Sequence, residues 1–295
     1  MESFFSEYIL PATLFIIMLG MGMSLEKSNF EKIILRPKAI IVGVFCQIFL
    51  LPFVVFALLY FLDISPYVKV GFIIIVACAG GSATNLITYM LKGNLALSVS
   101  LTSINSLLIL IALPIIVNIG LGFFLGESAN IVLPVGDTIV NIVFSIILPV
   151  ILGMIIRTYF FVFTLRVNKL LKYLLPLLLL SVFVFIIFFD DKGENAGIIE
   201  YLYIVPYALI LNILSMLIVY GFSRIVLLSN RTSFTLSIEV GLKNSIIGIF
   251  VAKTLLANHE MAMVSVVYGA FTFFSTYFLA YIEKKIGKKK NKNPN

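Results

Sequence analysis

The stretch Ser237-Ile-Glu-Val-Gly-Leu-Lys-Asn-Ser245 places one carboxylate, that of Glu239, inside a long apolar segment near the C-terminus. A charged side chain at the centre of a bilayer costs roughly 3 kcal/mol on insertion scales. Ionisable groups that are kept at this depth usually serve the passage of an ion or a solute. The stretch therefore indicates a transport role for the fold that surrounds it.

The composition predicts an all-α polytopic membrane protein. Of the 295 residues, 61% are hydrophobic and 12% are charged, which is typical of chains that cross a bilayer several times. A hydrocarbon core of about 30 Å takes about 20 helical residues. Nine apolar stretches are long enough to cross it, near residues 6–25, 38–62, 67–91, 95–119, 138–156, 170–189, 201–223, 232–256 and 262–282.

The charges between these stretches predict the orientation in the membrane. Lysines and arginines gather after the first, third, fifth and seventh stretches and in the basic tail, residues 284–295, whereas Asp63, Asp190 and Glu194 lie in loops of the other side. We therefore expect a multi-pass protein of the cell membrane, with the N-terminus outside and the C-terminus cytoplasmic. This topology explains the net charge of +7, so we expect contact with membrane lipid, no nucleic acid and no obligate protein partner.

Two of the predicted helices are interrupted by small and polar residues. The third contains Gly80-Gly-Ser-Ala-Thr-Asn85, and the eighth contains Glu239-Val-Gly-Leu-Lys-Asn-Ser245. Glycines weaken a helix and let backbones approach each other, although small residues also serve ordinary helix packing in membranes. The two helices enter from opposite sides, at corresponding places in the two halves of the chain. We therefore expect an inverted repeat in which helices 2–4 match helices 7–9.

Such breaks and a polar stripe beside them predict a site for a cation and an anion. Unwound backbone supplies carbonyl oxygens to a cation, and freed helix N-termini present N–H groups to an anion. Ser98, Thr102 and Asn105 share one face of the fourth helix because they are four and three residues apart. Taken singly, such residues more often bond to their own helix or a neighbour. Asn212, in the seventh helix, is expected to hold helices together.

At these residues the chain resembles the bile acid:sodium symporter family. The similarity rests on Gln47-Ile-Phe-Leu-Leu-Pro52, Gly80-Gly-Ser-Ala-Thr-Asn-Leu-Ile-Thr-Tyr89, Gly93-Asn-Leu-Ala-Leu-Ser-Val-Ser-Leu-Thr102 and Glu239-Val-Gly-Leu-Lys-Asn-Ser245. It extends through 21–24, 36–38 and 148–153, so it covers nearly the whole chain.

The resemblance implies the nine-helix form of an inverted-repeat transporter fold, with two discontinuous helices that cross. The chain would form one transmembrane unit, followed by the cytoplasmic tail at 284–295. A panel domain would contain the helices near 6–25, 138–156 and 170–189. A core domain would contain those near 38–62, 67–91, 95–119, 201–223, 232–256 and 262–282.

The resemblance also implies two sodium sites. The first would use Thr84, Asn85, Ser98, Thr102 and Glu239. The second would use Gln47, Glu239, Val240, Leu242 and Lys243, some of them through main-chain carbonyls.

The second site departs from the family pattern, which has glutamine where this chain has Lys243. An ammonium offers no oxygen to Na⁺ and repels it. We hypothesise that Lys243 occupies the second cation position, paired with Glu239, so that one sodium is coupled per cycle. Two alternatives stay open. Lys243 extends to water and the second site is lost, or it releases its proton and couples transport to protons.

The predicted function is sodium-coupled symport of an organic anion by alternating access. Ser82, Asn244 and Ser245 lie where freed helix N-termini are expected, so they are candidate contacts for a carboxylate. Bile-acid-binding members of the family carry a polar pair on the last helix, where this chain has Phe271-Thr-Phe-Phe274. We therefore expect a small carboxylate, such as a keto or hydroxy acid, in preference to a bile acid.

Three other functions are weighed against this one. A proton-coupled or uncoupled organic-anion carrier of the same architecture is the nearest alternative. A non-transporting membrane receptor or scaffold is a different class, and it would tolerate Glu239→Gln. An enzyme is not expected, because the sequence contains neither Gly-x-Ser-x-Gly nor His-Glu-x-x-His and no paired catalytic carboxylates at membrane depth.

Overall fold

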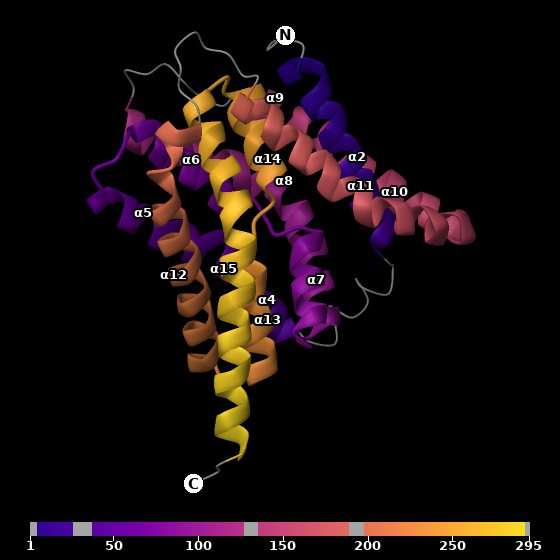
Figure 1. The fold of residues 1–295 in the computed structure, drawn as a ribbon, viewed down its shortest axis with the longest axis vertical. Helices are drawn as coiled ribbons and strands as arrows, with labels where there is room; N and C mark the ends of the chain where they lie inside the picture. The colour runs from indigo at the N-terminus through magenta and orange to yellow at the C-terminus, as the bar shows by residue number, and fades with distance from the viewer. Residues whose placement is uncertain (1–4, 26–36, 127–134, 189–197, 293–295) are drawn as a thin grey trace.

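The computed structural model describes residues 5–25, 37–126, 135–188 and 198–292. Every regular element within these ranges is helical (Figure 1). Hydrogen bonds inside each helix satisfy the backbone polar groups without water, as a bilayer interior requires. The all-α prediction is therefore confirmed for the described residues.

One group of helices packs around α2, with α10 and α11 against it and against each other. These three helices lie together on one side of the molecule (Figure 1). The group comprises η1 (Phe5–Ile9), α2 (Leu10–Ser24), α9 (Val135–Ile142), η4 (Val143–Ile147), α10 (Leu148–Tyr159) and α11 (Phe161–Phe188). It contains the stretches that were assigned to the panel domain.

Two glycines let α2 and α10 approach closely. A Cβ atom on Gly22 would lie 2.2 Å from the carbonyl oxygen of Val150, and one on Gly153 would lie 2.3 Å from that of Leu19. Small residues at such contacts are the usual means of tight helix packing in membranes. The C-terminal end of α2 is held as well, since the Arg157 guanidinium donates to the Met23 carbonyl at 2.9 Å. The pair α2–α10 is thus closely packed along its length.

The remaining helices form a second group, in which α12 packs on α13 and α15, and α6 packs on α8 and α15. The group comprises α4 (Pro37–Phe45), η2 (Cys46–Leu50), α5 (Leu51–Phe61), α6 (Pro66–Ala77), α7 (Ser82–Met90), α8 (Leu95–Leu125), η5 (Ile198–Tyr201), α12 (Ile204–Ile225), α13 (Asn230–Gly241), α14 (Ser245–Phe250), η6 (Val251–Leu255) and α15 (His259–Lys292). A separate core domain, moving against a panel, stays a prediction.

Prolines explain two wide turns inside long helices. Pro52 follows the π-helical turn η2, and Pro149 follows η4. Proline lacks an N–H and its ring clashes with the carbonyl four residues earlier, which favours a wider preceding turn. In the second helix this turn carries Gln47, whose side chain is buried at 4% exposure. Sequence thus shapes the backbone at one residue of the predicted second site.

The number of membrane spans is confirmed in part. Among the described residues, six helices are long and apolar enough to cross a membrane, or seven when α8 counts as one span despite a bend of 60° between Leu95–Ile109 and Ile111–Leu125. The other two predicted spans correspond to the interrupted pair α6–α7 and to α11, whose first turns carry Arg166.

Some helices run beyond the predicted ends. The last helix continues to Lys292, well past residue 282, and α11 begins at Phe161 instead of near residue 170. Lysine, arginine and leucine are good helix formers. The length of an apolar stretch therefore predicts the segment that can cross a membrane and does not predict where the helix begins or ends.

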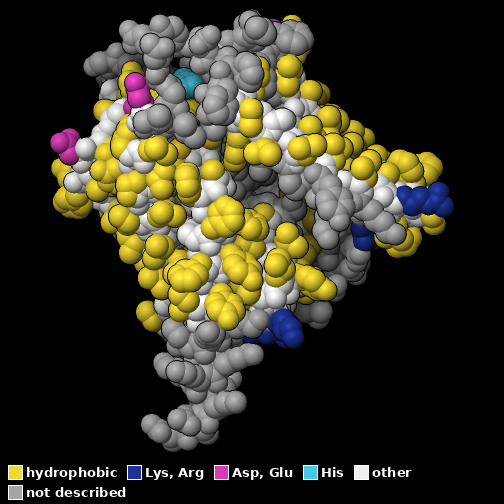
Figure 2. Space-filling view, viewed as in Figure 1, with side chains coloured by type: hydrophobic (Ala, Val, Ile, Leu, Met, Phe, Trp, Pro, Cys, Tyr) yellow, Lys and Arg dark blue, Asp and Glu magenta, His cyan; other side chains and the backbone are white. Residues whose placement is uncertain are grey.

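The outer surface agrees with a membrane protein. Hydrophobic side chains cover most of the face in Figure 2. Asp, Glu and His side chains show near the end where the N-terminus lies, while Lys and Arg show towards the C-terminal end and at the tip of α10 and α11. The side of the membrane that each end faces stays a prediction.

Candidate functional site

The two predicted helix breaks are present, and they meet. Helix α6 ends at Ala77 and α7 begins at Ser82, while α13 ends at Gly241 and α14 begins at Ser245. The backbone N–H of Asn244 in the second break donates to the Ala79 carbonyl in the first at 2.9 Å. Two segments more than 160 residues apart are thus joined where each has lost its helical hydrogen bonds.

Glu239 lies beside this junction and is 2% exposed. Its two carboxylate oxygens contact hydroxyl groups of α8: Thr102 Oγ1 donates to Oε1 at 2.7 Å, and Ser98 Oγ lies 3.0 Å from Oε2. A Cβ atom on Gly80 would lie 3.2 Å from Oε1, so the glycine of the first break leaves the space that the carboxylate fills. The buried carboxylate therefore has short polar contacts and almost no exposed surface.

The five residues of the predicted first site form one cluster. Asn85 Oδ1 lies 2.8 Å from Ser98 Oγ, and Thr84 Oγ1 lies 3.5 Å from Thr102 Oγ1 and 2.7 Å from the Gly81 carbonyl. Helices α7, α8 and α13 contribute these side chains. The resemblance to a known family predicted that these five residues lie close together, and the contacts in the structure agree. Whether they bind sodium stays a prediction.

The cluster has more oxygen acceptors than hydroxyl protons. The single proton of Ser98 is shared between Asn85 Oδ1 and Glu239 Oε2. The single proton of Thr102 is shared between Glu239 Oε1 and the Ser98 carbonyl at 2.9 Å. Each hydroxyl can donate only once, so some lone pairs face one another without a proton between them. A hard cation with a preference for oxygen would satisfy them.

The second predicted set centres on Gln47 and Lys243. The Gln47 amide donates to the carbonyls of Val76 and Cys78 at 3.1 and 3.3 Å. Its oxygen accepts from the Lys243 ammonium at 2.7 Å. Lys243 is 8% exposed, which argues against the alternative in which it reaches water.

The expected partner of Lys243 differs from the observed one. Among the described residues the ammonium donates to Gln47, whereas the Glu239 carboxylate is held by hydroxyl groups of α8. The helix ends between them, at Gly241, and Leu242 has extended backbone with φ −97° and ψ 134°. Val240 and Leu242 are both buried at the end of α13.

The three candidate anion contacts have different surroundings. Ser82 is the first residue of α7, but its side chain lies outside the described part of the structure. Asn244 lies between the half-helices, with its backbone N–H already bonded to Ala79. Ser245 opens α14, and its buried hydroxyl lacks a hydrogen-bond partner. That hydroxyl packs against Gly269 of α15, where a Cβ would lie 2.4 Å away.

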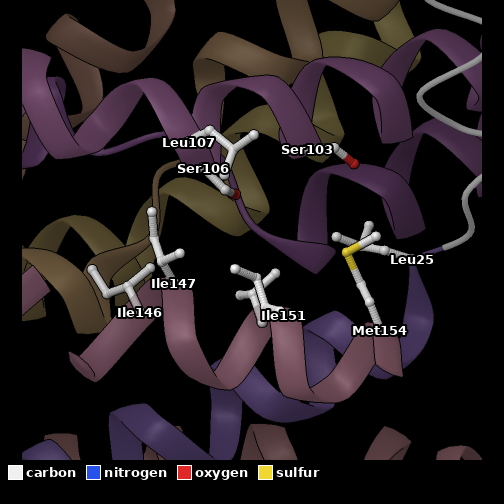
Figure 3. A pocket seen from close by; sticks show the side chains of 9 residues that line it. Leu25, Ser103, Ser106, Leu107, Ile146, Ile147, Ile151 and Met154 are labelled. Carbon is white, nitrogen blue, oxygen red and sulfur yellow. The ribbon is translucent and has the colours of Figure 1, made fainter. Parts of the chain in front are cut away.

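A cavity of about 350 Å³ separates α8 from α10. Figure 3 shows Ser103 and Ser106 facing Ile147, Ile151 and Met154 across it. Both serine hydroxyls donate to their own helix, so the walls of the cavity are effectively apolar. Ser106 bonds to the Thr102 carbonyl, which places the cavity one helical turn from the polar cluster.

Sequence reasoning missed the contacts that hold the second break. Asn212 was expected only to join helices, yet its amide donates to the Gly241 carbonyl at 2.6 Å, and Tyr268 Oη donates to the same oxygen at 3.1 Å. A lone amide in an apolar helix was the available signal. Its target could not be read from spacing, because α12, α13 and α15 are distant in the chain.

Comparisons with known proteins agree with this geometry. Residues 11–195 match the profile of the Sodium Bile acid symporter family. The chain is 29% identical to the "uncharacterized sodium-dependent transporter YocS" of Bacillus subtilis over 93% of its own length and 83% of that protein. It is also 29% identical to the "probable sodium/metabolite cotransporter BASS1, chloroplastic" of Arabidopsis thaliana, over 82% of its own length and 58% of that protein.

A human relative matches a shorter part. The ileal sodium/bile acid cotransporter is 35% identical over 149 residues, which are 50% of this chain and 42% of that protein. The family profile covers more than half of the chain, and the members it groups are transporters, not enzymes. With its helices long enough to span a membrane and its interrupted pair meeting at a buried carboxylate, the chain belongs to the sodium bile acid symporter family of membrane transporters.

Proposed function

We propose that this protein couples the entry of sodium to the transport of a small organic anion by alternating access. The observation that carries the proposal is the Glu239 carboxylate, buried at the junction of two helix breaks and contacted by hydroxyls of α8. Relatives whose names describe sodium-dependent transport and sodium/metabolite cotransport support it.

Sodium would bind in the cluster of Thr84, Asn85, Ser98, Thr102 and Glu239. Their oxygens converge from three helices, and the shortage of protons among them favours a cation. Without an ion, Glu239 is a buried negative charge, which costs several kcal/mol in such surroundings. Binding one Na⁺ removes most of that cost, so the ion and the closed arrangement of α7, α8 and α13 stabilise each other.

One sodium per cycle follows from Lys243. Its ammonium is already held against Gln47, one residue of the predicted second site. A second cation beside it would be repelled, since the repulsion between two like unit charges 4 Å apart is about 4 kcal/mol at an effective dielectric constant of 20. The ammonium thus stands in for the second sodium, and its link to Gln47 replaces the ion pair with Glu239 that the sequence suggested.

The transported solute is proposed to be a small carboxylate. Freed N–H groups at the start of α7 attract an anion, and the apolar cavity between α8 and α10 has room for a short hydrocarbon body. Movement of the α2–α10–α11 group against the other helices would open this cavity to each side in turn. The proposed orientation has the N-terminus outside and the C-terminus in the cytoplasm, because positive loops favour the cytoplasmic side.

Uptake into proteoliposomes tests the proposal. Labelled 2-oxo acids, hydroxy acids and a bile acid are offered under an inward sodium gradient, under equal sodium, and with choline in place of sodium. A parallel series imposes a pH gradient without sodium. We expect accumulation of a small carboxylate with the sodium gradient alone. Accumulation driven by the pH gradient instead would favour the proton-coupled carrier, and uptake that ignores both gradients would favour the uncoupled one.

A binding assay separates transport from the receptor alternative. Thermal unfolding of the purified protein is followed with and without sodium and each carboxylate, since a ligand that binds only the folded state raises its stability. Stabilisation by ligand without any uptake would support a receptor or scaffold and would contradict the proposed function.

A further inference from the structure

The Gly241 carbonyl, at the last residue of α13, is held by two donors from different helices. Asn212 Nδ2 of α12 lies 2.6 Å from it, and Tyr268 Oη of α15 lies 3.1 Å from it. A helix end normally leaves this oxygen to water or to the next turn, and here the chain leaves the helix at a buried residue. The absence of a side chain at Gly241 permits the close approach, because a Cβ there would lie 2.8 Å from Met216 of α12.

The amide of Asn212 is itself fixed. The side chain is fully buried, its Nδ2 also lies 3.0 Å from Thr276 Oγ1, and its Oδ1 accepts from Ser275 Oγ at 2.7 Å. An amide with both its oxygen and its nitrogen bonded cannot rotate freely. Asn212 therefore links three helices at one point and sets the place of the Gly241 peptide.

That peptide lies midway between the two buried charged residues of the site. Glu239 is two residues before Gly241 and Lys243 is two residues after it. The backbone is helical up to Gly241 and extended at Leu242. Fixing the Gly241 carbonyl towards α12 and α15 fixes where the helix stops. It thereby fixes the direction in which Glu239 faces α8 and Lys243 faces Gln47.

The first break is held by the same kind of group. Gln47, from the helix that precedes α6, donates its amide to the freed carbonyls of Val76 and Cys78. Asn212 belongs to the helix that precedes α13 and donates to the freed carbonyl of Gly241. In both halves an amide on the helix before the broken one holds the end of the first half-helix.

We propose that Asn212 is a positioning residue for cation binding, which holds the Gly241 peptide so that Glu239 and Lys243 keep their places at the junction. The inference rests on the proposed function, because it assumes that the Glu239 cluster binds sodium. Asn212 does not touch the ion. Its removal would lower sodium affinity through Glu239, while the rate at saturating sodium would change much less.

The test compares Asn212→Leu, Asn212→Ser and Tyr268→Phe with a control on the same helix. Ser223 of α12 is buried and its hydroxyl has no hydrogen-bond partner, so Ser223→Ala removes a polar atom without breaking a contact. For each variant in proteoliposomes we measure the sodium concentration for half-maximal uptake, the maximal rate, and the thermal unfolding midpoint in detergent with and without sodium.

We expect Asn212→Leu to raise the half-maximal sodium concentration by about five- to tenfold, Tyr268→Phe to raise it by about two- to fivefold, and Ser223→Ala to leave it unchanged. The stabilisation by sodium should weaken in the same order. If Asn212→Leu does not fold, Asn212→Ser and Tyr268→Phe decide the matter. A lower unfolding midpoint with an unchanged sodium requirement in the folded variants would overturn the inference. Lack of sodium dependence in the unsubstituted protein would instead overturn the proposed function.

Discussion

At the first break the amide of Gln47 holds the carbonyls of Val76 and Cys78, and at the second the amide of Asn212 holds that of Gly241. The oxygens of the two amides have different partners. Gln47 accepts from the buried ammonium of Lys243, at 2.7 Å, and so joins one half of the chain to the other. Asn212 accepts from a neutral hydroxyl of α15 in its own half.

This difference indicates that a buried side-chain amide has a different role at each break. Around Asn212 all partners are neutral, so the contact fixes the backbone and carries no charge. Around Gln47 the same kind of contact also satisfies a buried cation, which would otherwise cost several kcal/mol. The first break should therefore be more sensitive to loss of its amide than the second.

The largest effect is expected at Glu239, the carboxylate through which the second break contacts α8. Glu239→Gln removes the negative charge and leaves the hydroxyls of Ser98 and Thr102 against an amide. Loss of hydrogen bonds to a charged group costs about 1.5–3 kcal/mol, so uptake at limiting sodium should fall by roughly 10- to 150-fold. Uptake of the identified carboxylate in proteoliposomes measures this.

Glu260→Gln is the matched control, because Glu260 lies in the first turn of α15 away from the junction. It should transport as well as the unsubstituted protein. A Glu239→Gln variant that keeps its sodium dependence would show that the carboxylate is not an ion ligand, and the receptor alternative would then have to be reconsidered.

Gln47→Leu tests whether the amide that holds a buried charge contributes more stability than the amide of Asn212. The substitution leaves the Lys243 ammonium buried without its partner, and removal of one member of a buried charged contact costs about 3–5 kcal/mol. Asn212→Leu leaves only neutral groups unsatisfied, at about 1–3 kcal/mol. The thermal unfolding midpoint in detergent should therefore fall further for Gln47→Leu than for Asn212→Leu.

The double variant Gln47→Leu/Lys243→Met completes this test. Removing the charge together with its partner should recover part of the lost stability, because no buried ammonium remains. Additive effects of the two substitutions would mean that the ammonium and the amide do not depend on each other.

The sequence predicted most of the fold because the bilayer leaves few choices. Apolar length gave nearly all the helices, and glycines beside polar residues, at 80–85 and 239–245, marked both breaks. The structure also has a wide turn before Pro52 and before Pro149. Helix ends outside the lipid, such as Lys292, depend on propensity and not on hydropathy, so apolar length missed them.

The candidate site was predicted only where residues recur at fixed spacing or match a known family. Ser98 and Thr102 share a face by periodicity, and the structure brings them to Glu239. The hydrogen-bond partner of Lys243 was different, because Gln47 comes from a helix distant in the chain and no local pattern contains that contact. The role of Asn212 depends on how α12 packs against α13, which no local pattern contains.

Lys243→Gln tests the role of the ammonium and leaves the contacts of Gln47 and Asn212 with backbone carbonyls in place. A glutamine could still reach Gln47, and it adds an oxygen where the ammonium stood. If Lys243 replaces a second cation, the sodium dependence of uptake should change from hyperbolic to sigmoid, with a Hill coefficient that rises from about one towards two. Lys38→Gln at the exposed start of α4 is the control. An unchanged dependence of uptake on sodium concentration would contradict the proposal that Lys243 takes the place of a second sodium ion.

The smallest effect is expected at Thr88, near the C-terminal end of α7. Its hydroxyl donates to Ser98 Oγ at 3.4 Å, a long contact compared with 2.7 Å between Thr102 and Glu239. Hydrogen bonds weaken with such distances, so Thr88→Val should raise the half-maximal sodium concentration by less than about twofold, whereas Thr102→Val should raise it by about tenfold. Sodium titration of uptake measures both variants. A change at Thr88 as large as that at Thr102 would mean that Thr88 itself contacts the ion, and the cluster around Glu239 would then extend further along α7 than the contacts in the structure indicate.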